Sequence, residues 1–303
     1  MRAISVWMMR PAGMLNASRG ENMRETFCGW YFKCQNGRQT LAVIPAEHGR
    51  GSQRSGSVQL ITDAGAWFVP FPGQPLCRDD EGIHIGQNHF GHNGVWLDLQ
   101  APDLCAQGLL SFGQLAPLRY DIMGPFCCVP GMECRHSVVS MRHAVSGAVR
   151  VNGEDFVFDS GVGYIEGDRG RAFPSRYMWT QCALPGGSLM LAVADIPLGG
   201  LRFTGVIGAV LWHGREYRLA TYLGARAVRI REGEVVVRQR GLSLSARLLE
   251  SAAQPLRAPK AGQMGRTIHE HAACRARYLF RQDDRTLFDH EARDASFEYE
   301  YPG

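Results

Sequence analysis

The sequence predicts an all-β protein that consists of two antiparallel β-barrels arranged in tandem. Three observations lead to this prediction: short runs in which apolar and polar residues alternate, glycine-containing turn signals between the runs, and a length of 303 residues. Alternation with a period of two is typical of a sheet with one buried face and one wet face. A meander can bury its edges by closing on itself. An eight-strand barrel uses about 120–150 residues, so the chain is long enough for two barrels.

Asn-Gly dipeptides predict two hairpins in the first half of the chain. Both residues tolerate a positive φ, so they fit the type I′ turn that joins two antiparallel strands. Asn36-Gly37 and Asn152-Gly153 each lie between two short runs. The strands predicted to pair are 31–35 with 38–44 and 144–151 with 154–159.

Three more turn signals predict an antiparallel meander in the second half. His213-Gly214, Leu223-Gly224 and Glu232-Gly233 separate four short runs, and strict alternation continues after Gly241. The four predicted strands are 205–212, 215–221, 226–231 and 235–240.

The stretch 159–163 is the best candidate for a domain boundary, because it places two glycines and a serine between strands. We therefore expect one barrel in residues 1–158 and a second barrel in residues 159–303. The glycine-, serine- and arginine-rich stretch 49–57 is expected to be a loop of the first barrel. No dinucleotide-binding or phosphate-binding glycine pattern follows a predicted strand.

Composition and charge exclude several classes of function. Apolar residues make up 45% and charged residues 20% of the chain, which is typical of a globular protein. The net charge is +4, and the 33 basic residues are interspersed with 29 acidic ones. No basic helix and no basic-aromatic strand motif accompanies this charge, so we expect no nucleic-acid partner.

The cysteines predict neither a disulfide framework nor a metal site. There are nine of them, an odd number, without a Cys-x-x-Cys pair. Cys128, Cys134 and His136 resemble a metal site only loosely, since zinc spacings are tighter and come in pairs. We expect reduced, mostly buried cysteines and no bound metal.

The chain is expected to be a soluble, cytoplasmic protein. The apolar part of its first segment is short for a secretory signal, and no small-residue cleavage site follows it. No apolar run approaches the length of about 18 residues that a spanning helix requires.

Residues 163–182 concentrate charge and aromatic rings within predicted strands. On an extended chain alternate side chains point the same way. Each of the two runs in this stretch therefore carries a row of functional side chains on one face. If the two runs pair, the carboxylates of one row face the aromatic rings and the amide of the other. Mutual repulsion and an apolar wall both raise carboxyl pKa values, and such an acid is suited to protonating an electron-rich alkene. The two rows are Tyr164, Glu166, Asp168 and Tyr177, Trp179, Gln181.

A structural interpretation of the same residues stays open. Asp168 can simply pair with Arg169 or Arg171, and Trp179 can be a core anchor. Arg169 next to Asp168 would favour the ionised form of that carboxyl, which counts against Asp168 as the acid.

Glu133 and His136 form a second candidate pair for acid–base chemistry. At a spacing of three they lie on opposite faces of a strand unless a bulge intervenes. A lone histidine on a strand is more often a satisfied polar residue than a functional one.

Several stretches, in order along most of the chain, resemble the tocopherol cyclase family, in particular its bacterial members. Within them, Gly167 and Arg169 stand where the family commonly has lysine and tryptophan, and Cys28 stands where it often has glutamate. The matching stretches are GWYFKC (29–34), GPF and VPGMECRHSVVSM (124–141), GYIEGDRG and AFPSRYMWTQC (163–182), IPLGGLRFTGVIGAV (196–210), GREYRLATYLGARA (214–227) and LRAPKAGQMGRTIHE (256–270).

This resemblance implies two lipocalin-like β-barrels, related to carotenoid-hydratase and fungal Diels–Alderase folds. It implies cyclisation of a prenylated hydroquinone to a chromanol, without a metal or organic cofactor. In that reaction an acid protonates the alkene of the prenyl chain, and the phenol oxygen captures the resulting cation.

The residues and the resemblance together lead to one set of site predictions. Glu166 or Asp168 is expected to donate the proton. Other residues are expected to bind or orient the substrate, either by contacting it or by holding a residue that contacts it. They are Trp30, Tyr31, Glu133, His136, Tyr164, Arg169, Tyr177, Trp179 and Gln181.

Two other functions remain open from the sequence. One is a non-catalytic lipocalin-like carrier of an apolar isoprenoid or lipid, and the other is a hydratase in which water captures the cation. All three functions imply an apolar small molecule as partner. Such a ligand favours transient contact with a membrane surface, although no amphipathic basic helix supports it. The oligomeric state is not predicted.

Overall fold

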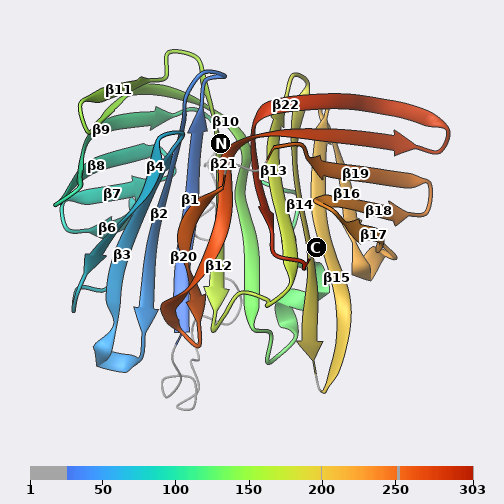
Figure 1. The fold of residues 1–303 in the computed structure, drawn as a ribbon, viewed down its shortest axis with the longest axis horizontal. Coiled ribbons are helices and arrows are strands. Elements are labelled where there is room, and N and C mark those ends of the chain that lie inside the picture. Colours follow the sequence, from blue (N-terminus) through green and yellow to red (C-terminus); the bar gives the residue numbers. More distant parts are fainter. Residues whose placement is uncertain (1–25, 199, 251–252, 303) are drawn as a thin grey trace.

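The computed structural model describes residues 26–198, 200–250 and 253–302. These residues form 22 β-strands and three short 3-10 helices, so the prediction of an all-β protein is confirmed. Every strand pair among them is antiparallel, and the strands form two sheets that lie side by side (Figure 1). The first segment, which is not expected to be a secretory signal, lies outside the described residues.

The first sheet contains the strands from the N-terminal half of the chain. Its hydrogen-bonded order is β4-β3-β2-β1-β12-β10-β9-β8-β7-β6-β5, and β11 pairs with β10. Its strands and helices are β1 (Thr26–Gln35), β2 (Thr40–Gly49), η3 (Gly51–Gln53), β3 (Ser55–Thr62), β4 (Gly65–Phe71), β5 (Cys77–Arg78), β6 (Gly82–Ile85), β7 (Asn88–Gly91), β8 (Gly94–Ala101), β9 (Leu104–Phe112), η4 (Gly124–Cys128), β10 (Cys134–Val151), β11 (Glu154–Val157) and β12 (Gly161–Gly170).

The second sheet has the order β16-β15-β14-β13-β22-β21-β19-β18-β17, with β20 paired to β21. Its elements are β13 (Tyr177–Leu184), β14 (Gly187–Leu198), β15 (Leu201–Trp212), β16 (Arg215–Ala220), η5 (Thr221–Leu223), β17 (Arg226–Arg231), β18 (Glu234–Gln239), β19 (Leu242–Leu248), β20 (Gln254–Lys260), β21 (Gln263–Gln282) and β22 (Arg285–Tyr299).

Most of the predicted hairpins are confirmed, together with their turn chemistry. Asn152 and Gly153 have φ values of 50° and 91°, and His213 and Gly214 have values of 47° and 77°. Two successive positive φ values are the requirement of a type I′ turn. The strands on either side, β10 with β11 and β15 with β16, pair as expected.

The predicted four-strand meander is wrong at Leu223-Gly224. β16 and β17 lie at opposite ends of the sheet order instead of pairing. The reason is that Gly224, with φ of 90°, caps the short helix η5 and donates its N–H to the carbonyl of Thr221. Glycine in the left-handed conformation ends a helix as readily as it makes a hairpin. Each sheet order is an open path among the described strands, so closure into barrels is not confirmed.

The change from one sheet to the other occurs at residues 171–176. β12 pairs with β1 on one side and β10 on the other, so it completes the first sheet. The predicted boundary at residues 158 and 159 therefore falls before a strand of the first sheet. Two separate domains remain a prediction.

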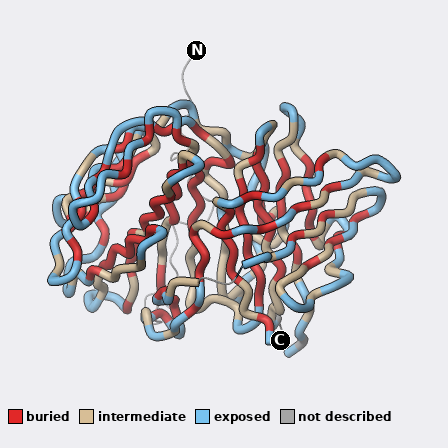
Figure 2. The backbone as a smooth tube through the Cα atoms, turned by 45° about the horizontal axis from the view of Figure 1, so that its top comes forward, coloured by how far each residue is buried: buried red, intermediate tan, exposed pale blue. Residues whose placement is uncertain are grey.

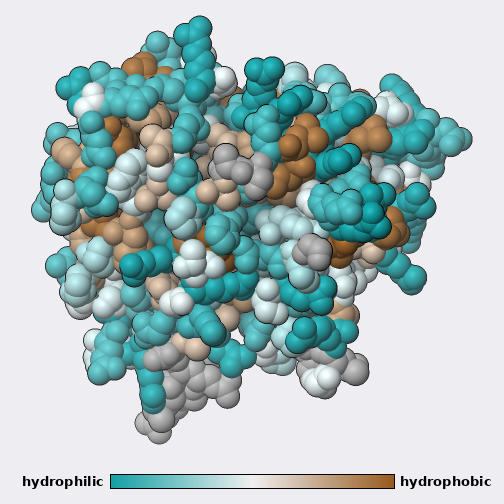
Figure 3. All heavy atoms as spheres, viewed as in Figure 1, coloured by the Kyte–Doolittle hydropathy of each residue, from teal (hydrophilic) through white to brown (hydrophobic). Residues whose placement is uncertain are grey.

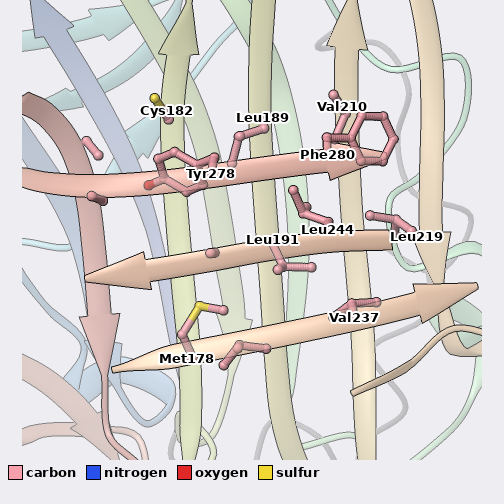
Figure 4. Close-up of a cluster of buried hydrophobic side chains, with 14 of the residues drawn as sticks. Met178, Cys182, Leu189, Leu191, Val210, Leu219, Val237, Leu244, Tyr278 and Phe280 are labelled. Carbon is pink, nitrogen blue, oxygen red and sulfur yellow. The ribbon is translucent and has the colours of Figure 1, made fainter. Parts of the chain in front are cut away.

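Three clusters of buried apolar side chains hold the structure together. Consecutive residues of β1 point to opposite faces, and Tyr31 and Phe32 accordingly belong to different clusters. One cluster lies within each sheet, and Figure 4 shows that of the second sheet. The third lies between the sheets and takes side chains from both, among them Tyr31, Ile61, Trp179, Met190 and Ile268. The central strands are therefore buried on both faces, as Figure 2 shows.

The surface in Figure 3 is mostly hydrophilic, with small apolar patches. Within the described residues, no helix is long and apolar enough to cross a membrane.

Candidate functional site

A cavity of about 180 Å³ lies between the two sheets, within the third apolar cluster. Strands of both sheets and the short helix η4 line it. Apolar and aromatic side chains dominate its wall, including Phe27, Ile44, Phe126, Phe173, Ile207 and Ile268. A mostly apolar cavity with a few polar groups is the usual form of a small-molecule site.

One group of charged side chains on the first sheet faces this cavity. We call His136, Glu166 and Asp168 the histidine cluster. His136 on β10 lies directly opposite Asp168 on β12 in the strand register. Its Nδ1 lies 3.0 Å from Asp168 Oδ1, and its Nε2 lies 3.2 Å from Glu166 Oε2. The imidazole therefore lies between the two carboxylates.

Glu166 is surrounded by hydrogen-bond donors from both sheets. The hydroxyl of Tyr164 donates to Glu166 Oε2 at 2.5 Å, and Nε1 of Trp179 donates to the same oxygen at 3.1 Å. Tyr164 lies two residues before Glu166 on the same face of β12, whereas Trp179 reaches it from β13 of the second sheet. Donors to a carboxylate favour its ionised form.

The two carboxylates determine the charge of His136. Burial alone would lower the pKa of His136, but the charges of Glu166 and Asp168 outweigh it and raise the pKa well above its usual value. Burial raises the pKa of Glu166, and the charge of His136 opposes this shift. The contact between His136 and Glu166 is an interaction of charges and not an aligned hydrogen bond, since Nε2 of His136 has no hydrogen-bond partner among the described residues. A positively charged imidazole beside this cavity is the result.

The histidine cluster is the group of described residues in which ligand atoms come close enough for a metal, within 4.8 Å of one another. Its arrangement suits an ion-pair chain better. Each ring nitrogen of His136 already faces a carboxylate oxygen, so a metal would have to displace one carboxylate to reach a nitrogen lone pair.

A second group of acids faces the cavity from the second sheet. We call Glu270 on β21 and Glu298 on β22 the glutamate pair. They are directly opposite each other in the strand register, and only 1% and 8% of their surfaces are exposed. The hydroxyl of Tyr177 donates a hydrogen bond to Glu298 Oε2. Oε1 of Glu270 is buried and has no hydrogen-bond partner among the described residues.

The pKa values of the glutamate pair are both raised. For Glu270, burial and then the charge of Glu166 outweigh the favourable contact with Tyr31 and raise the pKa to about 7. For Glu298, burial and then the charge of Glu270 raise the pKa well above its usual value. Ionisation of both carboxyl groups at directly opposite positions of a buried strand pair is unfavourable, because two negative charges would then lie close together away from water.

The glutamate pair was not predicted from the sequence, although one signal was available. In β21, Ile268, Glu270 and Ala272 alternate on one face, and all three are buried. An acid at an inward position of an otherwise apolar alternation is unusual, so it marks a group that needs a partner or a function.

Seven of the eleven predicted site residues line the cavity. They are Trp30, Tyr31, His136, Glu166, Asp168, Tyr177 and Trp179. The two predicted rows do face each other, but β12 and β13 belong to different sheets and do not pair. Tyr31 and Trp179 contact edge to face across the gap, with ring centroids 5.5 Å apart.

The other four predicted residues lie off the cavity wall. Tyr164 lies behind Glu166. Gln181 accepts a hydrogen bond from the buried Lys33. Arg169 lies on the face of β12 opposite to that of its neighbour Asp168. Glu133 contributes its backbone carbonyl, which accepts hydrogen bonds from the N–H groups of 171 and 172.

Gly167, in place of the lysine that the resembled family carries, has a local reason. A Cβ at this position would lie 3.1 Å from the Cδ1 atom of Trp30 and 3.3 Å from the carbonyl oxygen of Gly29. The absence of a side chain therefore lets the Trp30 ring lie against the centre of β12.

No family model matches the sequence, and no curated protein matches it either. The crystal structure of CghA with Sch210972 is similar over 91% of this chain and 88% of that one, with a TM-score of 0.57 and 10% identity. The crystal structure of kievitone hydratase from Nectria haematococca is similar over 92% and 90%, with a TM-score of 0.50 and 9% identity. At such identities the similarity shows a shared fold, and membership of the tocopherol cyclase family stays a prediction.

Proposed function

We propose that this protein is an enzyme that protonates an alkene of an apolar substrate bound between its two sheets. The substrate class is a prenylated hydroquinone, which closes to a chromanol-type ring in a tocopherol cyclase-like reaction. The observation that carries the proposal is the convergence of four carboxyl groups on one apolar, aromatic-walled cavity. These groups are Glu166, Asp168, Glu270 and Glu298.

The cavity offers what each stage of such a reaction requires. Burial keeps a carboxyl group protonated near neutral pH, so that it can act as a general acid. The cation that forms lies beside the rings of Tyr31 and Trp179, and aromatic faces stabilise positive charge. The phenol oxygen belongs to the same bound molecule, so ring closure needs orientation and no second reactant. The net reaction is an isomerisation and consumes no oxidant or reductant.

Hydration is the second candidate function. It starts with the same protonation, but water captures the cation. The structural similarity to kievitone hydratase favours this candidate, as does the position of Asp168, whose side chain is 21% exposed at the edge of the histidine cluster.

Native extraction followed by mass spectrometry tests the proposal. Small molecules bound to the purified protein are extracted and then incubated with fresh protein. Conversion to an isomer of unchanged mass supports the cyclase, and a gain of one water supports the hydratase. A bound lipid that never changes contradicts both and identifies a carrier.

The double variant Glu166→Gln with Asp168→Asn tests the role predicted for these carboxyl groups. Turnover should be abolished while circular dichroism shows an unchanged β-fold, because His136 loses both of its charged partners. Undiminished turnover would remove the histidine cluster from the mechanism.

A further inference from the structure

We propose that Glu270, supported by Glu298, is the acid that donates the proton in this cavity, and that the histidine cluster is its ionised counterpart. This inference rests on the proposed function and names a different group for the first step. It comes from the positions of the two glutamates and from the partners that each cluster has or lacks.

The strand register places the two carboxyl groups together. Glu270 and Glu298 are directly opposite on adjacent antiparallel strands, and both line the cavity. Side chains at such positions have Cβ atoms about 4.5–5.5 Å apart. One proton held by the pair removes the repulsion between two buried negative charges, so the pair retains a proton where a lone surface glutamate would lose it.

The hydrogen bonds around the pair distinguish its two members. Glu298 accepts a hydrogen bond from the Tyr177 hydroxyl, so one of its oxygens already has a partner. Glu270 has a buried Oε1 without a partner among the described residues, and its side chain lines the cavity. A buried oxygen without a partner costs free energy unless a proton or a ligand satisfies it. A carboxylic acid O–H directed toward a bound substrate would satisfy it.

The charged and titratable groups around Glu270 come from several elements. β1 contributes Tyr31 and Lys33, β12 contributes Glu166, and β22 contributes Glu298. β2 and β3 contribute only uncharged side chains to the cavity wall, and β20 contributes Arg257. Burial opposes ionisation of Glu270 most strongly and the charge of Glu166 adds to it, whereas the Tyr31 hydroxyl and the cation Lys33 favour ionisation. The net result is a pKa of about 7 for Glu270, and the charge of Glu270 in turn raises the pKa of Glu298.

The histidine cluster differs at each of these points. Glu166 has the hydroxyl of Tyr164, the indole N–H of Trp179 and the cation of His136 around it. A carboxylate with three such neighbours is a poor proton donor. It is well placed to balance positive charge that develops on a substrate beside Trp179.

The proposed step balances in protons and electrons. The π electrons of the substrate alkene form a C–H bond with the proton of Glu270, and the electron pair of the broken O–H bond stays on the carboxylate. The phenol oxygen forms a C–O bond to the cationic carbon. The phenolic proton then returns to the Glu270 carboxylate, which restores the acid.

Infrared difference spectroscopy tests the protonation without any substrate. The wild-type protein should show a protonated-carboxyl C=O band that decays with a midpoint at a pH of about 7. Glu270→Gln should remove this component, whereas Glu291→Gln, at an exposed position of β22, should leave it unchanged. A wild-type protein without such a band, or a band that Glu270→Gln leaves intact, would overturn the inference.

Turnover measurements then test the catalytic role. The probe is a hydroquinone that carries a trisubstituted prenyl chain, with product followed by chromatography. Glu270→Gln should lower turnover by about 10²- to 10⁴-fold, the usual contribution of a general acid, and Glu291→Gln should not. Glu298→Gln should retain some turnover with a shifted pH profile.

The two levels of the proposal fail in different ways. If the wild type and Glu270→Gln convert the probe equally, the acid is elsewhere and the proposed function stands. If the wild type converts neither the probe nor its native ligand, the proposed function fails, and the infrared experiment still decides whether Glu270 is protonated.

Discussion

The histidine cluster and the glutamate pair face one cavity with the same type of side chain in opposite surroundings. Glu166 lies among a tyrosine hydroxyl, an indole N–H and an imidazolium. Glu270 faces another glutamate and has an oxygen without a partner among the described residues. Both glutamates are almost completely buried, at 5% and 1% exposure.

This comparison teaches that burial alone does not assign a role to an acid. Burial raises the pKa of both carboxyl groups, but their neighbours differ. Surrounding donors and a cation favour the carboxylate form of Glu166, whereas Glu270 lacks a cation in contact with it among the described residues, and burial together with the charge of Glu166 favours its protonated form. A cavity with both can supply a proton on one side and balance the resulting positive charge on the other.

The largest effect is expected from removing His136. His136→Ala leaves the buried Glu166 and the partly buried Asp168 without the cation between them, which should destabilise the protein by about 3–5 kcal/mol. Because the folded pKa of His136 is raised, its ion pairs contribute fully below its unfolded pKa of about 6.5. Their contribution is lost as the pH rises through the folded value, so the difference from wild type should shrink in alkaline solution.

Urea unfolding across a pH series measures this effect. His269→Ala is the matched control, because that histidine lies on β21 with its side chain 67% exposed. Equal stabilities of His136→Ala and His269→Ala would contradict the ionic structure of the cluster.

Glu270→Gln should change the stability in the opposite direction and stabilise the protein in alkaline solution. The folded pKa of about 7 lies above the usual value of 4.5 for a glutamate, so the native state binds more protons than the unfolded state between these values. The wild type should therefore lose stability as the pH rises through this range, by roughly 3 kcal/mol at most. Glu270→Gln should lose this dependence and be more stable than wild type in alkaline urea titrations. A variant that is less stable at every pH would show that Glu270 is held as a carboxylate.

A smaller contrast is expected between the two tyrosines that donate to these acids. Tyr164→Phe removes a hydrogen bond to an ionised group and should cost about 2 kcal/mol, whereas Tyr177→Phe removes a hydrogen bond to a pair of carboxyl groups that retains a proton and should cost about 1 kcal/mol. Both hydroxyl groups are buried, and the substitution conserves the ring. Thermal and urea unfolding compare the two variants directly, and a reversed order would imply that the protonation states are exchanged.

The smallest effect is expected on the outer face of the second sheet. Arg277 and Asp289 form a bidentate ion pair between β21 and β22, but both are exposed. Exposed pairs contribute little to stability, so Arg277→Ala should unfold at nearly the same urea concentration as wild type. A marked loss of stability in Arg277→Ala would show that an exposed ion pair contributes as much to stability as the buried charged groups do.

The sequence predicted the parts of the fold that depend on local chemistry. Alternation and the turn at Asn152-Gly153 identified strands and hairpins, because side-chain period and positive φ are local properties. Leu223-Gly224 shows the limit, since a glycine in the left-handed region serves a hairpin turn and a helix cap equally well. Which strands end a sheet depends on contacts between distant segments, and no local signal carries that information.

The site was predicted in part for the same reason. Glu166, Asp168 and Trp179 lie close together in the sequence, so their concentration was visible. Glu270 and Glu298 are far from these residues in the chain, and only the register between β21 and β22 brings the two carboxyl groups together. His136 was expected to act with Glu133. Its partner is instead Asp168, because Asp168 on β12 lies directly opposite His136 on β10 in the strand register.

The division of the apolar interior into three clusters bears on how this protein can diverge. Each sheet has its own core, while the cavity belongs to the third cluster, which lies between the sheets. Substitutions at Ile44 or Ile207 therefore change the shape of the binding space without touching the core of either sheet. Selection can alter the ligand in small steps while folding is maintained elsewhere, so related chains should differ most at this shared wall and least in the two separate cores.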